Sequence, residues 1–172
     1  NFTYGMPIVA AIRRLTDLPI DVHLMISEPG KYISQFVDAG ADLLTIHAEI
    51  AQETGPVLEQ IRSLGVGAGL ALNPSTSLQA VEQELPLCDL LLIMSVDAGF
   101  GGQSFNPVAL DKLKAVRTEH PKLLLEVDGG INLQTIAECS QAGATMFVVG
   151  SAIFGQDDYK IAIAQLVDAI GR

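Results

Sequence analysis

The sequence predicts an α/β fold built from repeated strand–helix units, and three observations support this prediction. Apolar runs of strand length alternate with helical patterns about every 20–25 residues, which is typical of parallel βα units. Nearly half of the residues are hydrophobic (49%) and only 17% are charged, as expected when parallel strands are buried beneath helices. The chain of 172 residues is long enough for one domain with a substantial core.

The strands are expected where apolar runs end at turn residues. They lie at residues 20–25, 43–47, 67–72, 90–95, 123–128 and 146–149. Helices are expected from residue 6 to 15 and then after each strand, where hydrophobic residues recur at helical spacing. These residues are Ile33, Phe36 and Val37; Val57, Leu58, Ile61 and Leu64; Leu78 and Val81; Leu110 and Leu113; Leu133 and Ile136; and Ile163, Leu166, Val167 and Ile170.

Two helix ends have similar sequences. Ala39-Gly40-Ala41-Asp42 and Ala142-Gly143-Ala144-Thr145 each follow a helical pattern and precede a strand. Glycine at that point predicts a left-handed cap, in which a residue without a side chain is favoured.

Six strand–helix units fit either an open doubly wound sheet or a (β/α)8 TIM barrel without its first quarter. The extra helix before the first strand favours the barrel, as does a length below the usual barrel range of roughly 200 residues or more. We therefore expect residues 1–172 to form a single barrel domain that lacks its first two strands. An open six-strand sheet would expose two long edges, so we expect the missing segment in the natural protein.

Charge and composition exclude several classes of function. The formal net charge of −10 argues against a nucleic-acid partner, because phosphate backbones require basic patches. The apolar runs are too short to span a membrane, and no basic-then-apolar signal sequence opens the chain. Cys88 and Cys139 lie in apolar surroundings and are interpreted as reduced core residues. The sequence predicts a cytoplasmic protein.

Residues 123–132, Leu-Leu-Leu-Glu-Val-Asp-Gly-Gly-Ile-Asn, contain the strongest candidate for a catalytic group. Side chains alternate along a strand, so Glu126 and Asp128 share one face of an otherwise apolar strand. Burying two carboxylates is costly unless the protein uses them. Asp128 is the last residue of the strand, where parallel-sheet enzymes place their chemistry. An Asp-Gly turn or a helix cap accounts for Asp128 equally well.

Histidines near the ends of two other strands are candidates for a polar cluster. If His23, His47 and Asp128 all point into the barrel, polar groups meet at the carboxyl ends of three strands. A lone histidine in a strand is most often a hydrogen-bonded core residue, but His23 beside Asp128 would suit zinc or a similar divalent ion. His47 could be a metal ligand, an acid–base group or a structural donor, and we favour a structural role or one that supports a ligand. Met25 and Met94 would ordinarily fill the core.

Three glycine loops follow strands and precede helices, and so offer backbone amides to a phosphate. They are Gly99-Phe100-Gly101-Gly102, Gly129-Gly130 and Gly150-Ser151. The last two would follow strands seven and eight of a complete barrel, where many barrels bind phosphate. The alternative is that these glycines only allow the chain to turn and bind no phosphate.

With these residues laid out, the chain closely resembles the ribulose-phosphate 3-epimerase family. The matching stretches follow the family order over essentially the whole chain. They are Asp21-Val22-His23-Leu24-Met25, Asn73-Pro74-Ser75-Thr76, Met94-Ser95-Val96, Gly99-Phe100-Gly101-Gly102-Gln103-Ser104-Phe105, Glu126-Val127-Asp128-Gly129-Gly130-Ile131 and Gly150-Ser151-Ala152-Ile153-Phe154.

The resemblance implies a (β/α)8 barrel of the ribulose-phosphate binding type. It implies an isomerase that converts D-ribulose 5-phosphate to D-xylulose 5-phosphate through an enediolate, in the pentose phosphate pathway. The implied partners are a phosphorylated ketopentose and further copies of the chain in a homo-oligomer. The implied cofactor is one divalent metal ion, with zinc preferred over iron, manganese or cobalt.

Roles transfer only to positions that match the family motifs. His23 resembles a metal ligand that also contacts substrate, and Asp128 resembles a metal ligand, a substrate contact and one of two catalytic carboxylates. Met25 and Met94 resemble thioethers that line the reacting face. Residues of the three glycine loops resemble substrate and phosphate contacts: Gly99, Phe100, Gly101, Gly102, Gly129, Gly130, Gly150 and Ser151.

The chain departs from the family pattern in two places. Asp97-Ala98 stands where the family usually has an X-Pro pair, which bears on the rigidity of that loop. The family's first two strands, which carry a metal-binding histidine and the second catalytic aspartate, are expected to be missing. This chain alone is therefore predicted to be inactive.

Three other functions remain open at this point. An allulose-6-phosphate 3-epimerase would use the same residues on a six-carbon sugar. The chain could be an inactive phosphate-binding fragment, because the second aspartate is absent. An unrelated doubly wound binding protein is the most distant alternative.

Overall fold

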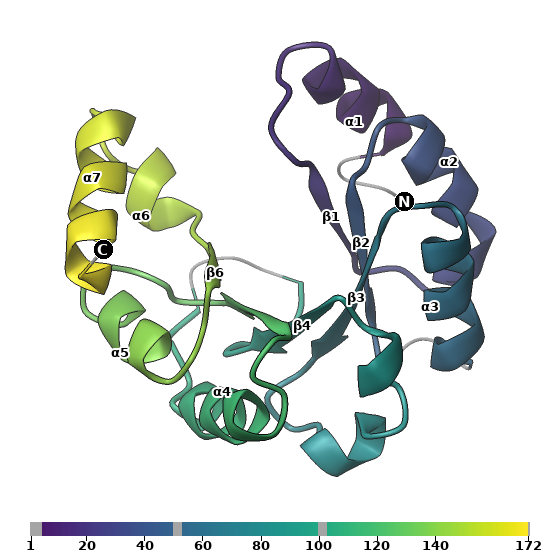
Figure 1. The fold of residues 1–172 in the computed structure, drawn as a ribbon. Helices are drawn as coiled ribbons and strands as arrows, with labels where there is room; N and C mark the ends of the chain where they lie inside the picture. Colours follow the sequence, from purple (N-terminus) through teal and green to yellow (C-terminus); the bar gives the residue numbers. More distant parts are fainter. Residues whose placement is uncertain (1–4, 50–52, 100–102, 172) are drawn as a thin grey trace. The chain divides into compact units, whose positions relative to one another are not determined.

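The computed structural model describes residues 5–49, 53–99 and 103–171, and it contains six strands that alternate with helices (Figure 1). The strand order in the sheet follows the chain. The strands are β1 (Asp21–Leu24), β2 (Leu43–His47), β3 (Gly67–Leu72), β4 (Leu90–Met94), β5 (Leu124–Asp128) and β6 (Met146–Val148). Pairing is parallel between β1 and β2, between β2 and β3, and between β5 and β6. This confirms the predicted α/β architecture, and each strand lies within one residue of its predicted bounds.

The helices also occur where the sequence predicts them. They are α1 (Met6–Arg13), α2 (Ile33–Asp38), α3 (Thr54–Ser63), α4 (Val108–Glu119), α5 (Ile136–Gln141), α6 (Ser151–Phe154) and α7 (Tyr159–Ile170), with 3-10 turns η1 (Pro29–Lys31), η2 (Leu78–Val81) and η3 (Leu85–Leu87). Three details differ from the prediction. Leu133, expected in the same helix as Ile136, lies in the turn before α5. The segment carrying Leu78 and Val81 is a 3-10 turn, and the short helix α6 was not predicted.

The chain divides into two compact units. The first unit contains residues 1–71 and 81–90, which include β1 to β3 and α1 to α3. Helices α1, α2 and α3 lie side by side along these strands (Figure 1). Its core contains Leu44 and Ile46 of β2, Ala68 and Leu70 of β3, and Phe36 and Ile61 of the helices, all of which are fully buried.

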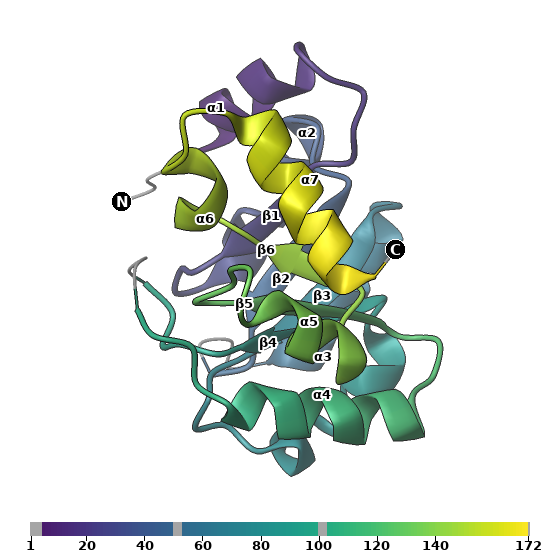
Figure 2. The same ribbon diagram turned by 90° about the vertical axis from the view of Figure 1, so that its left-hand side faces the viewer.

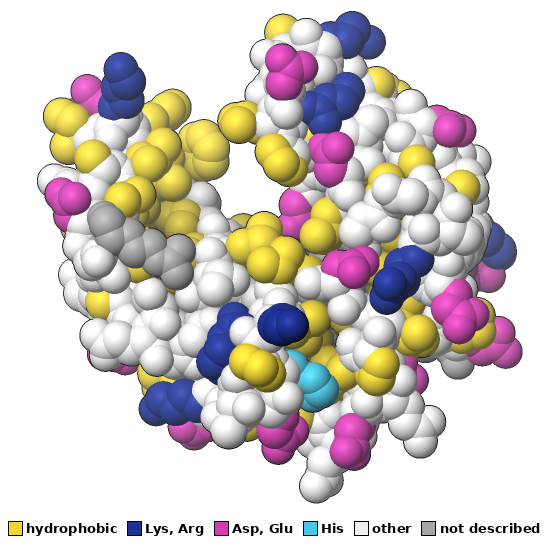
Figure 3. Space-filling view, in the orientation of Figure 1, with side chains coloured by type: hydrophobic (Ala, Val, Ile, Leu, Met, Phe, Trp, Pro, Cys, Tyr) yellow, Lys and Arg dark blue, Asp and Glu magenta, His cyan; other side chains and the backbone are white. Residues whose placement is uncertain are grey.

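The second unit contains residues 72–80 and 91–172, with β4 to β6 and α4 to α7. Figure 2 shows α7 lying against α5 and α6. Only Ala162 and Leu166 of α7 are buried. Ile163 and Val167 lie in this helix, as predicted, and are 47% and 44% exposed. Hydrophobic side chains gather over α6 and α7 in Figure 3.

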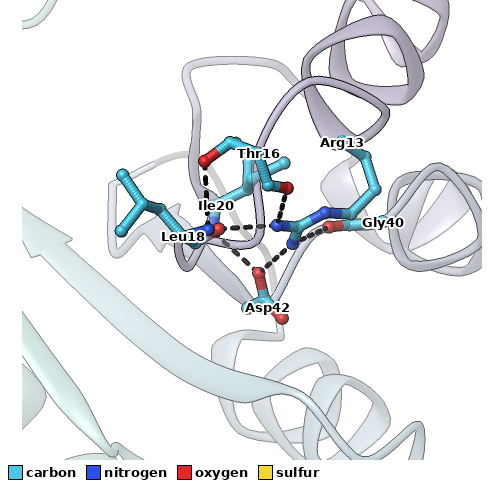
Figure 4. Close-up of polar contacts among 6 residues, drawn as sticks. All are labelled: Arg13, Thr16, Leu18, Ile20, Gly40 and Asp42. Atoms are coloured by element: carbon cyan, nitrogen blue, oxygen red, sulfur yellow. Dashed lines mark hydrogen bonds and ion pairs between the residues drawn. The ribbon is translucent and has the colours of Figure 1, made fainter.

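Arg13 joins three segments of the first unit (Figure 4). Its guanidinium donates to the carbonyl oxygens of Thr16 and Leu18 at 2.6 and 2.7 Å, and to that of Gly40 at 3.4 Å. It also forms an ion pair with Asp42 at 2.7 Å. We call this group of contacts the Arg13 clamp.

Arg117 forms a corresponding clamp in the second unit. Its guanidinium donates to the carbonyl oxygen of Gly143 at 2.8 and 3.2 Å, to that of Pro121 at 2.8 Å and to that of Leu123 at 3.0 Å. Gly40 and Gly143 both have positive φ, 104° and 112°, which confirms the two left-handed helix caps.

Among the helices that the structure describes, none is both long and apolar enough to cross a membrane.

Candidate active site

His23 and His47 meet on one face of the first unit. His23 of β1 is the register partner of Thr45 of β2, and His47 lies two residues further along β2, so its side chain projects to the same face. The two Nε2 atoms are 2.7 Å apart. His47 is almost fully buried, at 1% exposed. The structural role expected of His47 stays a prediction.

Glu49 adds a carboxylate to the pair of histidines. Its Oε2 lies 3.1 Å from Nδ1 of His47, and the His47 side chain is 0% exposed. Burial, together with the neighbouring His47, lowers the pKa of His23 from 6.5 to about 3. His23 is therefore neutral at physiological pH, which is the form that binds metal ions.

The face that carries the two histidines is closely packed around Thr45. A Cβ atom at Gly69 would collide with Oγ1 of Thr45, so only glycine fits at this position of β3. Among the described residues, Thr45 Oγ1 is the buried side-chain polar atom without a hydrogen-bond partner.

Asp128 ends β5 in the second unit, as predicted, and it is partly exposed. Its backbone carbonyl accepts a hydrogen bond of 2.7 Å from the backbone N–H of Ser95. The hydroxyl of Ser95 donates to the carbonyl of Gly129. Ser95, which is fully buried, thus ties the end of β4 to the residues at which β5 ends.

Gly129 and Gly130 require glycine for two reasons. Their φ angles are 110° and 62°, a region that L side chains disfavour. A Cβ at Gly129 would lie 2.6 Å from a methyl carbon of Val96, and one at Gly130 would lie 2.7 Å from the backbone nitrogen of Phe105. The loop after Asp128 therefore lies close to the chain that leaves β4.

The loop after β6 leaves the sheet beside this one. Asp128 is the register partner of Val148, so the parallel strands β5 and β6 end at the same edge. Gly150 precedes α6, and Ser151 is its first residue. Two of the three predicted phosphate loops therefore lie next to each other. In the third loop, Gly99 has a φ of 140°, and Phe100, Gly101 and Gly102 lie outside the described residues.

The two methionines differ in environment. Met94 is the last residue of β4 and is 1% exposed, whereas Met25 follows β1 and is 42% exposed. Their expected role as lining residues of the reacting face stays a prediction.

A cavity of about 460 Å³ lies within the second unit, between the turn after β3 and the segment that leads from β4 to α4. Polar and apolar atoms line it about equally; the lining residues are Pro74, Ser75, Ser95, Val96, Asp97, Gln103, Ser104, Asn106 and Val108. This volume falls within the range of small-molecule sites.

Lys112 holds one wall of this cavity in place. It lies on the buried side of α4 and is only 9% exposed. Its ammonium group donates to the carbonyl oxygens of Asn73, Pro74 and Thr76 at 2.9, 2.9 and 2.6 Å. The Asn73 side chain in turn accepts a bond of 3.3 Å from the N–H of Ala98, a donor that a proline at this position would lack.

His23 belongs to the first unit and Asp128 to the second, and their shared metal site stays a prediction. Within the described part of the chain, no group of three or more His, Cys, Asp or Glu residues is placed to hold a metal ion.

Comparison with known protein families decides what kind of chain this is. Residues 1–154 match the model of the "Ribulose-phosphate 3 epimerase family". The chain belongs to this family. The resemblance seen in the sequence motifs is thereby confirmed, and with it the assignment of the chain to a family of isomerases.

Relatives named ribulose-phosphate 3-epimerase include one from Bacillus subtilis and one from Synechocystis. The one from Bacillus subtilis is 47% identical over 171 residues, which are 96% of this chain and 79% of the relative. The one from Synechocystis is 48% identical over 170 residues, which are 95% of this chain and 74% of the relative.

Solved structures of more distant proteins share the fold. A crystal structure of KGPDC from Streptococcus mutans has a TM-score of 0.82 and 18% sequence identity, covering 98% of this chain and 80% of that one. A 3-hexulose-6-phosphate synthase has a TM-score of 0.77 and 20% identity, covering 96% and 80%. These likenesses support the fold, which is the six-strand part of a TIM-barrel-type α/β protein.

Glu49 and Lys112 were not singled out from the sequence, although each left a signal. Glu49 follows His47 at a spacing of two, just past a strand, where both side chains can lie on one face. Lys112 lies among the buried Ala109, Leu113 and Val116 of α4, and a lysine on an apolar helix face usually has partners.

Proposed function

We propose that the protein containing this chain epimerises D-ribulose 5-phosphate at C3 and so produces D-xylulose 5-phosphate. The observation that supports this most strongly is the 47% identity, over 96% of the chain, to a relative named ribulose-phosphate 3-epimerase. Relatives this similar over a whole chain share most of their site residues, so the family reaction is the first candidate here.

Asp128 is the group that we propose to move a proton. Epimerisation next to a ketone removes the C3 proton from one face of the substrate and returns a proton to the other face. A carboxylate positioned on one face can act as base in one direction and, once protonated, as acid in the other. The fixed backbone around Asp128, bonded to Ser95 on the chain that leaves β4, would limit movement of this carboxylate.

We propose His23 and Asp128 as ligands of one divalent metal ion, with zinc preferred over iron, manganese and cobalt. The residues fit such an ion in kind, because a neutral imidazole and a carboxylate are both common zinc ligands. Catalytic zinc sites usually take three protein ligands, so these two would supply part of the set. When bound, the ion would act as a Lewis acid that stabilises the negative charge developing on the substrate.

The substrate's phosphate group would be bound mainly by backbone amides. The loops at Gly129-Gly130 and Gly150-Ser151 leave adjacent strands at one edge, and Gly99 begins the third loop. The chain has only ten lysines and arginines against twenty acids, and none of the ten lies in these loops. Amide donors can hold a phosphate without a basic side chain.

Solvent exchange tests the proposal directly. The natural protein containing this chain would be incubated with ribulose 5-phosphate in D₂O, and the sugar followed by proton NMR. We expect xylulose 5-phosphate to form with deuterium at C3. A parallel reaction with allulose 6-phosphate should have a much smaller kcat/KM. Absence of deuterium at C3 of the pentulose would contradict the proposal, and a higher kcat/KM on the hexulose would assign the six-carbon substrate instead.

A further inference from the structure

Lys112 is a buried charged residue that the proposed reaction does not use. It lies on α4 and is only 9% exposed. Lysines are rarely buried without partners, because an ammonium group that leaves water is costly unless it is bonded. The carbonyl oxygens of Asn73, Pro74 and Thr76 supply such partners, at 2.9, 2.9 and 2.6 Å. The burial of Lys112 is therefore tied to the turn at residues 73–76.

The turn depends on these contacts for its position. Its backbone closes with a bond of 3.1 Å from the N–H of Thr76 to the carbonyl of Asn73. Its four residues are partly or fully exposed, and Pro74 and Ser75 line the cavity, so burial contributes little to holding them. An ammonium group has three N–H donors. Because they radiate from one atom of Lys112 to three carbonyls, the turn is left with few orientations.

Asn73 connects the turn to the chain that leads into Gly99. Its Oδ1 accepts a bond of 3.3 Å from the N–H of Ala98, the residue before Gly99. A proline in place of Ala98 would have no N–H to donate. The side chain of Gln103 donates to the carbonyl of Asp97 at 2.9 Å. The chain before Gly99 is thus bonded both to the turn and to the residue at which the described chain resumes.

We propose that Lys112 and Asn73 are positioning residues for substrate binding. Lys112 holds the turn, and Asn73 holds the N–H of Ala98, so that together they set the position of the backbone at Gly99. This inference rests on the proposed function, in which the substrate's phosphate group binds backbone amides that include Gly99. It extends that function by naming two residues, away from the phosphate itself, on which the affinity for the substrate depends.

A phosphate contact should affect binding more than chemistry. The phosphate group keeps its charge and shape while the proton at C3 is exchanged, so the protein binds it equally well in the ground state and in the transition state. Loss of such a contact raises KM and leaves kcat nearly unchanged. A residue that only stabilised the fold would instead reduce the amount of active enzyme and leave KM as it is.

Two variants of the natural protein containing this chain test the proposal. Lys112→Met removes the ammonium group and keeps most of the side chain, and Asn73→Ala removes the acceptor for the N–H of Ala98. Each should raise KM for ribulose 5-phosphate about 10-fold, which corresponds to the loss of one good hydrogen bond, and should change kcat by less than about threefold. An unchanged KM in a folded, active Asn73→Ala protein would overturn the proposal, and so would a fall in kcat alone.

Lys114→Met is the matched control, because it removes the same charge from the exposed side of the same helix. Its KM for ribulose 5-phosphate should stay within about twofold of the natural value. Thermal melting of each variant checks that the fold is intact. If Lys112→Met does not fold, Asn73→Ala provides the test by itself, because Asn73 is partly exposed and its loss leaves no ammonium group buried without partners.

Hydrogen exchange of the Ala98 N–H tests the contact itself in the absence of substrate. Its rate, measured by NMR, should rise in Lys112→Met and in Asn73→Ala, whereas Asn73→Asp keeps an acceptor and should restore slow exchange. A rate that neither of the first two variants changes would overturn the proposal at any level of activity. If the natural protein does not act on ribulose 5-phosphate, the proposed function fails, and the exchange rates still show whether Lys112 and Asn73 hold this segment.

Discussion

The Arg13 and Arg117 clamps perform the same structural task in the two units with different chemistry. Each arginine lies near the end of a helix, binds carbonyls in the loop that leads to the next strand, and binds the carbonyl of a left-handed glycine cap one helix later. In the first unit the strand after that cap begins near Asp42, whose carboxylate also accepts from the backbone of Ile20 at 2.7 Å. In the second unit Thr145 takes this place, and its hydroxyl contacts Leu125.

This difference shows that the clamp does not depend on an ion pair. Backbone carbonyls provide most acceptors in both units, and a charged partner is present in only one. The Arg13 and Asp42 side chains are 27% and 50% exposed, so their ion pair is screened by solvent and contributes little. We therefore expect the two clamps to be similar in strength and to differ mainly in their response to salt.

The largest effects are expected at the two glycine caps. In Gly40→Ala and Gly143→Ala the new Cβ would lie 2.6 and 2.7 Å from carbons of Arg13 and Arg117, and the left-handed backbone adds about 1–2 kcal/mol. Urea unfolding of the natural protein should show a loss of roughly 2–3 kcal/mol in each, once the displaced arginine bonds are included.

Gly65→Ala and Gly171→Ala are the matched controls. Both residues have positive φ, 81° and 75°, but nothing lies within 4 Å of an added Cβ. They should lose only the backbone contribution, about 1 kcal/mol. Equal losses in caps and controls would show that the arginine contacts do not matter.

Removal of the arginines themselves should have the next largest effect. Arg13→Ala and Arg117→Ala should each reduce the free energy of unfolding by about 2 kcal/mol, because several carbonyls lose a charged donor. Arg→Lys variants should recover little, since one ammonium group cannot reach carbonyls arranged around a planar guanidinium. If one variant lost several times more free energy of unfolding than the other, the two clamps would not be similar in strength.

Replacing the residue after each cap should have a smaller effect that depends on salt in only one unit. Asp42→Asn should cost less than about 1 kcal/mol in low salt, and the cost should shrink at about 1 M salt because the exposed pair is screened. Thr145→Val should cost about 1 kcal/mol in both conditions, because it removes neutral hydrogen bonds. A strong salt dependence for Thr145→Val would contradict this assignment.

The last comparison concerns the reactivity of the two cysteine thiols, one in each unit, which should be smallest in the native protein. Both are buried and free, and burial raises the pKa of Cys88 and of Cys139 from 9.0 to about 12. Neither thiol of the native protein should react with a disulfide reagent at about pH 8, whereas both should react after unfolding.

The same shifts predict a loss of stability in alkali. Between pH 9 and 12 the unfolded chain loses thiol protons that the folded protein keeps, so the free energy of unfolding falls as pH rises. Cys88→Ala and Cys139→Ala should each remove part of this slope. A slope that neither variant changes would show that the thiols are not its source.

The sequence predicted the elements well because their signals are local. The strand ends at Asn73-Pro74 and Asp128-Gly129, and the caps at Gly40 and Gly143, follow from residue types that permit few backbone conformations or tolerate unusual ones. The face on which His23 and His47 lie follows from alternation along a strand. These patterns need no knowledge of distant contacts.

Contacts between segments could not be predicted in the same way. Arg13 lies 27 residues from Gly40, and Lys112 lies 36 to 39 residues from the carbonyls that it binds. Their meeting depends on packing rather than on local pattern. Alternation placed His47 on the correct face but could not show that its two nitrogens contact His23 and Glu49. Periodicity predicted helix α7 but did not identify which of its apolar residues are buried, since several faces of the helix carry apolar side chains.

Asp128→Asn provides the most direct test of the central claim, that Asp128 is a proton-transfer group for C3 of ribulose 5-phosphate. The natural protein carrying this change should incorporate deuterium from D₂O at C3 about 10²-fold more slowly or worse, the range typical for loss of a general acid–base group, with unchanged thermal stability. Asp111→Asn, on the exposed first turn of α4, should exchange at the normal rate. Near-normal exchange in a folded Asp128→Asn protein would contradict the account.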